Sequence, residues 1–525
     1  MDTRSSVVEL LEARSEDRPD HVALVDSSRS MTFLELYRIT TQTCSALIHL
    51  GVSKGDRIGV CMSKSIEQVI ALIAILRAGA IAVPILPSLK RDNILHIITN
   101  CGMSVVITDE ARLQEVACCP ETCSVIIGKG EATAEHPNLP YISQHLNPVE
   151  RNVTLDADDL GMIIYSSGST GRPKGIMITH KNLVDGAEIT KQYLTTLPSD
   201  RIGGLLSLNF DYGLNQLWQT LLVGCTLCLH EPLLPNDTFR FIEEYEVTAL
   251  PLMPVLIERL FDARLLDHRL HFRLEKVRYI TSSGGRVAPW MLDKLRTTFP
   301  VAQIFLMYGL TEAFRSTYLP PDQLEKRPNS IGIPVPNVEV FVIGPDGREC
   351  EANVAGELVH RGGCVSKGYW NDPELTREKF RGSPKFPGEL LVHSGDMVRR
   401  DKEGFLYFIG REDGQIKNMG IRISPTEIET QAELHEDIRS TVVFGIDNQV
   451  DSQEIVLCYT SFSGQEIKKQ SLFIFLKKHL PAHMIPHHIQ HFLSFPATGN
   501  QGKVDREAVR DSVRIERIRS SAPHS

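Results

Sequence analysis

The stretch YSSGSTGRPKG, Tyr165–Gly175, decides how the rest of this sequence is interpreted. It continues the strand-like run GMIIY (Gly161–Tyr165) and combines three glycines, four serine or threonine residues and one lysine. Such a loop offers closely spaced N–H and O–H donors and a positive charge, which are the groups that hold nucleotide phosphates. Pro173 before Lys174 and Gly175 after it do not fit the Walker A pattern G-x-x-x-x-G-K-[ST]. A switch GTPase or an ATP-driven motor is therefore disfavoured.

Two further strand-like runs end in polar, glycine-containing turns. VRYIT (Val277–Thr281) leads into SSGGR, and QIFLM (Gln303–Met307) leads into YGLTE. Short apolar runs that alternate with helical segments predict an α/β fold, with layered sheets and helices and largely parallel strands. Because ligands bind beyond the carboxyl ends of parallel strands, we expect the three turns to share one cleft.

The pattern changes in the last third of the chain. From about Glu389, ELLVH and MVRR flank a predicted turn at SGD, and FLYFIGR follows the turn DKEG. The polar segment EDGQIKNMG after Arg411 is typical of a hinge. We predict a large N-terminal domain over residues 1–411 and a small mobile α+β domain over residues 412–525. In the second domain IRISPTEIE, STVVFGI and EIVLCYT are predicted strands, SLFIFLKKHL a helix, and the tail after Arg506 a fraying segment.

Composition excludes several classes of protein. Of the 525 residues 42% are hydrophobic and 23% charged, which indicates a globular chain. Lys+Arg 56 against Asp+Glu 65 gives a net charge of −9, which disfavours nucleic acid as a partner. The longest apolar run, Val69–Pro87, contains Arg77 and predicts a buried helix and strand joined at Gly79, so no membrane span is expected. A polar N-terminus without a secretion signal and eleven cysteines favour a cytoplasmic location.

Three more segments carry groups suited to a nucleotide. In YGLTEA (Tyr308–Ala313) the tyrosine can lie on a purine, the threonine can contact a phosphate, and Glu312 is a hard oxygen ligand suited to Mg²⁺. In HSGD, Asp396 can accept both ribose hydroxyls, although an aspartate at a turn more often caps that turn. In ATGNQGKVDR, Lys503 lies between a glycine and a strand-like valine. Each segment alone is a weak indication.

Taken in this order and spacing, the segments resemble the acyl- and aminoacyl-adenylate-forming enzymes, which include acyl-CoA synthetases, adenylation domains of nonribosomal peptide synthetases, and luciferases. The resemblance extends from TFLELYRIT at Thr32 to KVDR at Lys503. It implies a ligase that uses ATP and Mg²⁺ to activate a small carboxylic acid as an acyl-adenylate. The acyl group would then pass to a phosphopantetheine thiol, of CoA or of a separate carrier protein, after the C-terminal domain swings about its hinge.

The resemblance also assigns roles to residues. Thr311, Glu312 and Lys503 would be catalytic: Thr311 contacts the α-phosphate, Glu312 binds Mg²⁺, and Lys503 bridges the acid and the α-phosphate. Asp413 would be the hinge. The implied ATP-binding residues are Ser166, Ser167, Gly168, Ser169, Thr170, Gly171, Lys174, Gly284, Gly285, Arg286, Tyr308, Thr311, Asp396 and Arg411. The chain has Leu306 where the family often has an amide, so adenine recognition is expected to rest more on backbone groups.

The acid pocket is less clearly marked. NFDYGLNQ (Asn209–Gln216) matches the place where peptide-synthetase domains carry F-D-x-S, so Asp211 would bind a substrate amino group. The implied pocket residues are Asp211, Asn215, Met307, Arg315 and Ser316. Unpaired charges beside methylene groups are costly, so this set favours an amino acid or another small polar acid over a long-chain fatty acid. The alternative is that Asp211 and Arg315 pair with each other as scaffold.

Other interpretations stay open at this point. FDYGLNQ with MYGLTEAFRSTYLPP also resembles stand-alone acyl-CoA ligases associated with exosortase systems. A fatty- or aryl-acyl-CoA synthetase is the alternative within the enzyme class, and a non-catalytic nucleotide-binding regulatory protein is the alternative outside it. The histidines of HLPAHMIPHHIQHF are not interpreted as a metal site. Cys225 and Cys228, three apart in a strand-like run, are predicted to pack in the core on opposite faces.

Overall fold

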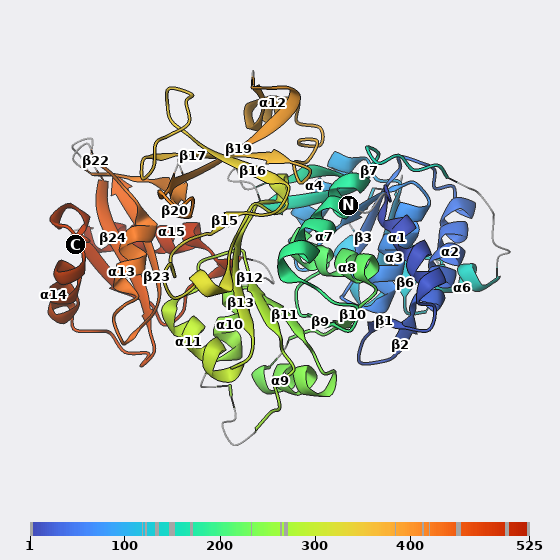
Figure 1. Cartoon of the computed structure of the whole chain (residues 1–525), viewed down its shortest axis with the longest axis horizontal. Coiled ribbons are helices and arrows are strands. Elements are labelled where there is room, and N and C mark those ends of the chain that lie inside the picture. Colours follow the sequence, from blue (N-terminus) through green and yellow to red (C-terminus); the bar gives the residue numbers. More distant parts are fainter. Residues whose placement is uncertain are drawn as a thin grey trace.

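The computed structural model describes residues 4–117, 119–120, 123–131, 136–145, 153–167, 172–232, 234–262, 265–266, 271–383, 385–411, 414–418, 421–447, 453–498 and 503–521. Figure 1 shows two large sheets with helices around them, and a smaller sheet domain at the C-terminal end. The predicted α/β class, with a small α+β domain after it, is confirmed.

The first large sheet has six strands in the order β6-β5-β3-β4-β7-β8, all parallel except the last pair. Its strands are β3 (Arg57–Cys61), β4 (Ile81–Pro84), β5 (Val105–Asp109), β6 (Ser124–Lys129), β7 (Leu160–Ser167) and β8 (Pro173–Thr179). Its helices are α1 (Val7–Asp17), α2 (Phe33–His49), α3 (Ile66–Arg77), α4 (Arg91–Cys101), α5 (Leu113–Val116) and α6 (Leu139–His145), with the 3₁₀ turn η1 (Glu110–Arg112). Gly79, at a positive φ of 72°, joins α3 to β4, so the predicted buried helix and strand are confirmed.

The second large sheet has nine strands in the order β15-β14-β13-β12-β11-β9-β10-β1-β2. Its parallel centre is β1 (Val22–Val25), β9 (Arg201–Gly204), β10 (Thr226–Leu229), β11 (Ala249–Leu252), β12 (Tyr279–Ser282) and β13 (Gln303–Tyr308). The antiparallel strands at its edges are β2 (Ser30–Thr32), β14 (Thr317–Leu319) and β15 (Ile333–Pro334).

Helices α7 (His180–Leu194) and α8 (Asp211–Val223) lie between the two sheets (Figure 1). α7 packs on β7 and β8, α8 packs on β9 and β10, and the two helices contact each other. The outer face of the second sheet is covered by α9 (Pro235–Glu244), α10 (Pro254–Leu260) and α11 (Pro289–Thr298). Cys225 is buried in the inner core and Cys228 in the outer one, which confirms their predicted packing on opposite faces.

A five-stranded antiparallel sheet follows. It consists of β16 (Val338–Ile343), β17 (Ala355–Gly362), β18 (Phe380–Ser383), β19 (Phe386–Arg400) and β20 (Leu406–Arg411), with α12 (Pro373–Lys379) and the 3₁₀ turns η2 (Thr311–Ala313) and η3 (Pro321–Gln323) nearby in the chain. The turn predicted at SGD is wrong, because β19 continues through it and pairs with β17 on both sides of it. Gly395, at φ 71°, bends the strand there. The turn predicted at DKEG, between β19 and β20, is confirmed.

The chain after residue 411 has a sheet of its own, formed by β23 (Ile438–Asp447), β24 (Gln453–Ser461) and β25 (His488–His491). Around it are β21 (Ile416–Asn418), β22 (Ile421–Ile423), α13 (Pro425–Ala432), α14 (Lys469–His479), η5 (Ala482–Met484), β26 (Ala497–Thr498), β27 (Lys503–Val504) and α15 (Arg506–Ser521). Two hydrophobic clusters in this part contain no residue before Ile416 among those described. We refer to this part as the C-terminal unit.

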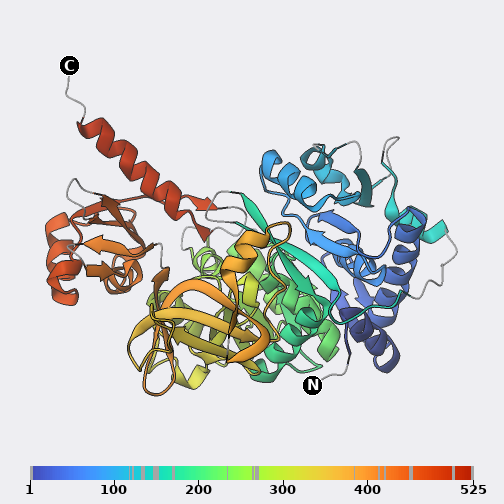
Figure 2. The same cartoon turned by 90° about the horizontal axis from the view of Figure 1, so that it is seen from above.

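Two expectations for the C-terminal unit are wrong. IRISPTEIE is not one strand: it contains β22 and then α13, because Ser424 Oγ accepts the N–H of Glu427 (3.2 Å) as an N-cap and Pro425 suits the first helical turn. The tail after Arg506 is helix α15, because Val509 and Val513 are buried against the sheet. Figure 2 shows α15 standing out from the sheet toward the C-terminus.

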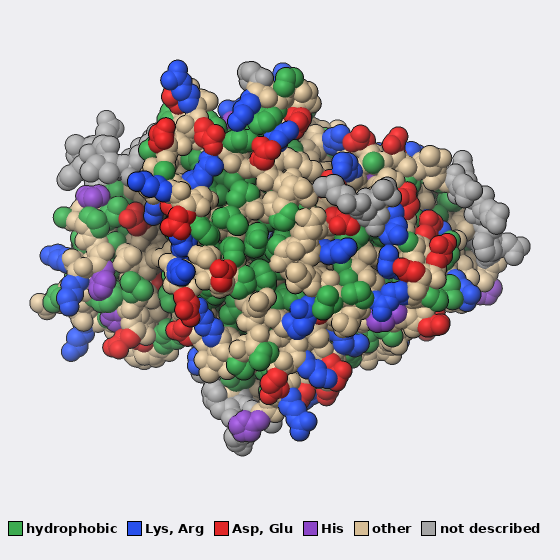
Figure 3. Space-filling model, viewed as in Figure 1, with side chains coloured by type: hydrophobic (Ala, Val, Ile, Leu, Met, Phe, Trp, Pro, Cys, Tyr) green, Lys and Arg blue, Asp and Glu red, His purple; other side chains and the backbone are tan. Residues whose placement is uncertain are grey.

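Within the described residues, no helix combines the length and the apolar character that a membrane crossing requires. Figure 3 shows basic and acidic side chains interspersed over one face of the molecule, without a large area of one sign. Proteins that bind a phosphate backbone carry clustered basic residues, and the face in Figure 3 has no such cluster among its described residues.

Candidate active site

The base of the Tyr165–Gly175 loop is held on two adjacent strands. Ser166 on β7 pairs with Lys174 on β8, and Ser167 pairs with Pro173. The loop is tied to α4, because Tyr165 O–H donates to Asn100 Oδ1 (2.5 Å) and His96 Nε2 donates to the carbonyl of Pro173 (3.1 Å). The other predicted phosphate-binding residues, Gly168, Ser169, Thr170 and Gly171, lie outside the described residues. The structure thus fixes both ends of the loop.

A second cluster joins three of the predicted ATP-binding residues. Tyr308, the last residue of β13, donates its O–H to Asp396 on β19. Asp396 pairs with Arg411 across the β19–β20 ladder, and Arg411 Nε lies 3.6 Å from Asp396 Oδ1. Burial and the Asp396 carboxylate raise the pKa of Tyr308 well above its usual value. Residues from three separate motifs therefore meet, as predicted.

Thr311 and Glu312 stand in the 3₁₀ turn η2, directly after β13 and beside this cluster in the chain. Tyr369 O–H donates to Glu312 Oε1 (2.6 Å), and the N–H of Ser366 donates to the Glu312 carbonyl (2.9 Å). Sequence reasoning missed Tyr369. No local pattern marks it, because it reaches Glu312 from the segment between β17 and α12.

The carboxylate of Glu312 is a hard oxygen donor of the kind that Mg²⁺ prefers. Within the described residues, no group of three or more His, Cys, Asp and Glu side chains is arranged to hold a metal ion. A site with one carboxylate suits Mg²⁺ bound mainly through substrate phosphates and water, which is how this ion is commonly held. The residues present therefore fit a nucleotide-bound magnesium ion.

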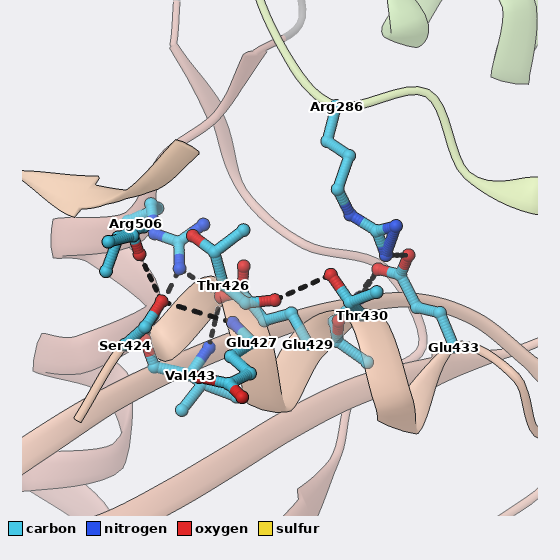
Figure 4. Close-up of polar contacts among 11 residues, drawn as sticks. Arg286, Ser424, Thr426, Glu427, Glu429, Thr430, Glu433, Val443 and Arg506 are labelled. Atoms are coloured by element: carbon cyan, nitrogen blue, oxygen red, sulfur yellow. Dashed lines mark hydrogen bonds and ion pairs between the residues drawn. The ribbon is translucent and has the colours of Figure 1, made fainter. Parts of the chain in front are cut away.

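The predicted adenine turn, Gly284 to Arg286, follows β12. Gly284 needs its positive φ of 84°, and a Cβ there would lie 2.8 Å from Met253 Cε. Arg286 points out of this turn toward the C-terminal unit and pairs with Glu433 at the end of α13 (Figure 4). Its predicted contact with adenine stays a prediction, because its guanidinium is engaged elsewhere in this arrangement.

The C-terminal unit also contacts α10 and α11. Arg439 Nε lies 2.8 Å from Glu258, and Trp290 Nε1 donates to the Arg439 carbonyl (3.1 Å). Glu433, the partner of Arg286, accepts hydrogen bonds from the N–H and the O–H of Thr441 (3.2 and 2.7 Å). These contacts position the C-terminal unit against the end of the second large sheet.

Lys503 lies in β27, where it pairs with Thr498 of β26. Its side chain and the predicted hinge residue Asp413 lie outside what the structure describes. Their predicted roles therefore stay predictions. The backbone of β27 is fixed to the C-terminal unit, because α15, which follows it directly, packs on the sheet of this unit.

A small cavity lies between α7, α8 and the second large sheet. Three of the five predicted pocket residues line it, namely Asn215, Met307 and Arg315. The full lining is Thr190, Leu194, Ile202, Tyr212, Asn215, Gln216, Gln219, Pro251, Tyr279, Thr281, Met307 and Arg315. Tyr279 and the two glutamines are lining residues that sequence reasoning missed, because α8 and β12 meet only in the fold.

The other two predicted pocket residues lie next to the cavity rather than on its lining. Asp211 is the first residue of α8, and its Oδ1 accepts the N–H of Tyr212 (2.8 Å). Burial raises the pKa of Asp211. Ser316 is fully buried beside Arg315. Within the described residues no ion pair of 4.0 Å or less joins Asp211 to Arg315, although the Arg315 charge counteracts the effect of burial on the pKa of Asp211.

Comparison with known proteins identifies the fold and the family. A family model described as AMP-binding enzyme matches residues 11–370. Tyrocidine synthase 1 of Brevibacillus parabrevis is 31% identical over 510 residues, which cover 96% of this chain and 45% of that protein. Surfactin synthase subunit 1 of Bacillus subtilis (strain 168) is 31% identical over 516 residues, covering 96% and 14%. The chain thus spans less than half the length of these curated relatives.

Solved structures agree on the fold. The anthranilate CoA ligase AuaEII in complex with anthranoyl-AMP superposes with a TM-score of 0.90 at 23% identity, covering 99% of each chain. The o-succinylbenzoate coenzyme A synthetase MenE of Bacillus subtilis, in complex with ATP and magnesium ion, superposes with a TM-score of 0.83 at 23% identity, covering 96% of this chain and 99% of that chain. The predicted membership of the adenylate-forming superfamily is confirmed.

Proposed function

This chain belongs to the AMP-binding enzyme family, and on that premise we propose that it is an ATP-dependent, AMP-forming acid–thiol ligase. The observation that carries the proposal is the meeting of Tyr308, Asp396 and Arg411 beside the turn that holds Glu312. These residues come from separate motifs and offer a ring, a carboxylate and a cation to a nucleoside. ATP and Mg²⁺ are the cofactors that this family and these groups imply.

In the first half-reaction a carboxylate oxygen of the acid attacks the α-phosphorus of ATP. The new oxygen–phosphorus bond forms as the bond to the β-phosphate oxygen breaks, and pyrophosphate leaves. Both reactants are anions, so the site has to offset their repulsion. In this proposal Lys174 and the loop donors hold the departing pyrophosphate, Thr311 contacts the α-phosphate, and Lys503 bridges the acid and the α-phosphate. Glu312 would hold Mg²⁺, which would neutralise further phosphate charge when bound.

In the second half-reaction a thiol sulfur attacks the acyl carbon, and AMP leaves. The acceptor is the phosphopantetheine thiol of CoA or of a carrier protein. Tyrocidine synthase 1 and the anthranilate CoA ligase AuaEII are both similar to this chain, so the proposal includes both acceptors.

The acid is an amino acid or another small polar acid. Support comes from the cavity, which is lined by amides, hydroxyls and a guanidinium as well as apolar groups. A long hydrocarbon chain would leave these polar groups without partners, which is costly. Asp211, at the start of α8 and next to this cavity, would bind a substrate amino group.

Residues 412–525 act as a lid that carries Lys503, with Asp413 as its hinge. The separate hydrophobic clusters of the C-terminal unit support this division, because a part with its own core can move as a body. The ion pair between Arg286 and Glu433 has to break when the lid turns.

Acid-dependent exchange of labelled pyrophosphate into ATP tests the proposal. The expected result is exchange that requires both an acid and Mg²⁺, with AMP as the nucleotide product once a thiol is added. Release of ADP and orthophosphate would overturn it. Exchange with long-chain fatty acids alone would support the proposed ligase activity and would contradict the proposed substrate class of small polar acids.

A further inference from the structure

The acid cavity contains two buried donors that have no hydrogen-bond partner among the described residues. Arg315 is 3% exposed and Asn215 is 1% exposed. Within the described residues, neither Arg315 Nε nor Asn215 Nδ2 donates a hydrogen bond. Both side chains line the same cavity. Buried donors in native proteins are nearly always paired, so two of them on one cavity indicate a ligand that supplies acceptors.

The orientation of the Asn215 amide is set by its neighbours. Asn215 Oδ1 accepts a hydrogen bond from Gln219 Nε2 (2.9 Å). Gln219 Oε1 in turn accepts the hydroxyl of Thr196 (3.0 Å), and Thr196 Oγ1 lies 3.2 Å from the Tyr279 hydroxyl. The NH₂ group of Asn215 is therefore left as the free end of this chain of hydrogen bonds. It is a preorganised donor.

Arg315 is also held in place. Its guanidinium carbon lies 4.5 Å from the centre of the Tyr212 ring, as in a cation–π contact. The Tyr212 hydroxyl is fixed in turn by a hydrogen bond with Thr281 Oγ1 (2.8 Å). A guanidinium stacked by its face keeps its N–H groups available at its edge, and that edge matches a carboxylate in a two-bond geometry.

Among the described residues, no carboxylate lies within 4.0 Å of this guanidinium. Asp211 forms no ion pair with it in the described part of the chain, and Glu312 accepts the Tyr369 hydroxyl. Asp211 is near enough to Glu312 for their charges to interact, whereas Asn215 stands one helical turn beyond Asp211 along α8 and Gln219 one turn further. A ligand group that meets Asn215 therefore lies further along α8 than Asp211.

We propose that the acid activated by this enzyme carries a second carboxylate, at the end away from the reacting carboxylate, bound by Arg315 and Asn215. The inference rests on the proposed function and deepens it. It adds an anionic group to the general class of small polar acids, and it makes Arg315 a specificity-determining residue. Asp211 can still bind an amino group on the same substrate.

Pairs of acids that differ only at the far end test the inference. Glutarate is compared with pentanoate, and glutamate with norvaline, by kcat/KM in pyrophosphate exchange. We expect the dicarboxylic member of at least one pair to be favoured on the order of 10²-fold, because a site built around buried donors rejects a substrate that leaves them unpaired. Equal rates, or a preference for the methyl-ended member in both pairs, would overturn the inference.

The variant Arg315→Met keeps the length of the side chain and removes its charge. We expect kcat/KM for the favoured diacid to fall about 10²-fold and that for its monoacid partner to fall less than tenfold, with Arg315→Lys between. Equal losses for both members would contradict the inference, because they would place Arg315 on the reacting carboxylate or in the scaffold. Thermal unfolding of each variant controls for misfolding.

The experiment separates this inference from the proposed function. Exchange with monoacids alone supports the proposed ligase activity and overturns the inference that the substrate carries a second carboxylate. If no acid in any pair supports exchange, the proposed function fails, and calorimetric binding of glutarate and of pentanoate to the full chain then decides the pocket question. Tighter binding of glutarate that is lost in Arg315→Met supports the inference, and equal binding overturns it.

Discussion

The nucleotide side and the acid side of the site differ in how their polar groups are satisfied. On the nucleotide side, Tyr308 donates to Asp396, Arg411 lies beside it, and Tyr369 donates to Glu312. On the acid side, Arg315 Nε and Asn215 Nδ2 have no hydrogen-bond partner in the described part of the chain. The first side is a mutually supporting network. The second is a cavity in which the substrate supplies the hydrogen-bond acceptors, so the donors that line it indicate the chemical class of the substrate.

This difference makes the two sides separable by mutation. Changes on the nucleotide side should alter catalysis or the KM for ATP whatever the acid. Changes on the acid side should alter the KM for the acid and leave the KM for ATP close to its original value. A change that affected both substrates equally would show that the two sides form one network.

Lys503→Ala should have the largest effect. Removing a charge positioned on the transition state typically costs on the order of 10²- to 10³-fold in rate, so exchange should fall by that factor for every acid. The measurement is pyrophosphate exchange at saturating ATP. Lys468→Ala, an exposed lysine in the same unit, is the matched control and should leave the rate unchanged. Comparable rates for Lys503→Ala and the wild type would remove Lys503 from the mechanism.

Asp396→Asn should raise the KM for ATP by roughly 10- to 100-fold, because hydrogen bonds to a charged group contribute about 1.5–3 kcal/mol. The amide oxygen can still accept the Tyr308 hydroxyl, so the fold of the cluster should be kept. Steady-state kinetics with ATP as the varied substrate provide the measurement. A shift in the KM for the acid instead would contradict the division into two sides.

Asn215→Ala should raise the KM for the acid by about tenfold and change the KM for ATP little, since a hydrogen bond to a charged carboxylate contributes at least about 1.5 kcal/mol. The comparison needs the favoured acid and its monoacid partner side by side. The effect should be present for the first and small for the second. An equal rise in both values of KM would indicate a packing defect.

Gly186→Ala should have the smallest effect on activity, and its effect on stability should be easier to detect. A Cβ at Gly186 would lie 2.6 Å from Phe314 Cδ1, and Phe314 already has a positive φ of 30°. Overpacking of this kind typically costs about 1–3 kcal/mol. The free energy of unfolding should fall by that amount, with a few-fold rise in the KM for the acid because Arg315 follows Phe314.

Gly382→Ala is the control for this variant, because a Cβ there has nothing within 4 Å and the glycine has no positive φ. Denaturant unfolding of both variants gives the comparison. Equal stabilities for the two would mean that Phe314 moves aside without cost, and that its position does not constrain Arg315.

The sequence marks part of the nucleotide side for a physical reason. Tyr308 and Arg411 stand at the ends of β13 and β20 in short motifs, whereas Asp396 lies within β19 and meets Tyr308 only in the fold. Tyr369 escapes prediction because it reaches Glu312 from a segment 57 residues further along the chain. The acid cavity is predicted only in part, since Gln219 and Tyr279 meet through the packing of α8 on the sheet.

Errors in the fold have similar causes. The turn expected at SGD is absent because β19 gains ladder partners from β17, which no local pattern reveals. The helix α15 was missed because its composition is strongly polar, although Val509 and Val513 are four residues apart and mark one buried face. Local chemistry is visible in the sequence, and partners supplied by distant segments are not.

Acid-dependent pyrophosphate exchange shows directly whether these residues form an acyl-adenylate. Labelled pyrophosphate is incubated with the enzyme, ATP and Mg²⁺, with and without a dicarboxylic acid such as glutarate or glutamate. We expect labelled ATP to form only when the acid is present, and we expect the Lys503→Ala variant to lose this acid-dependent incorporation of label. Acid-independent exchange, or cleavage of ATP to ADP and orthophosphate, would contradict it.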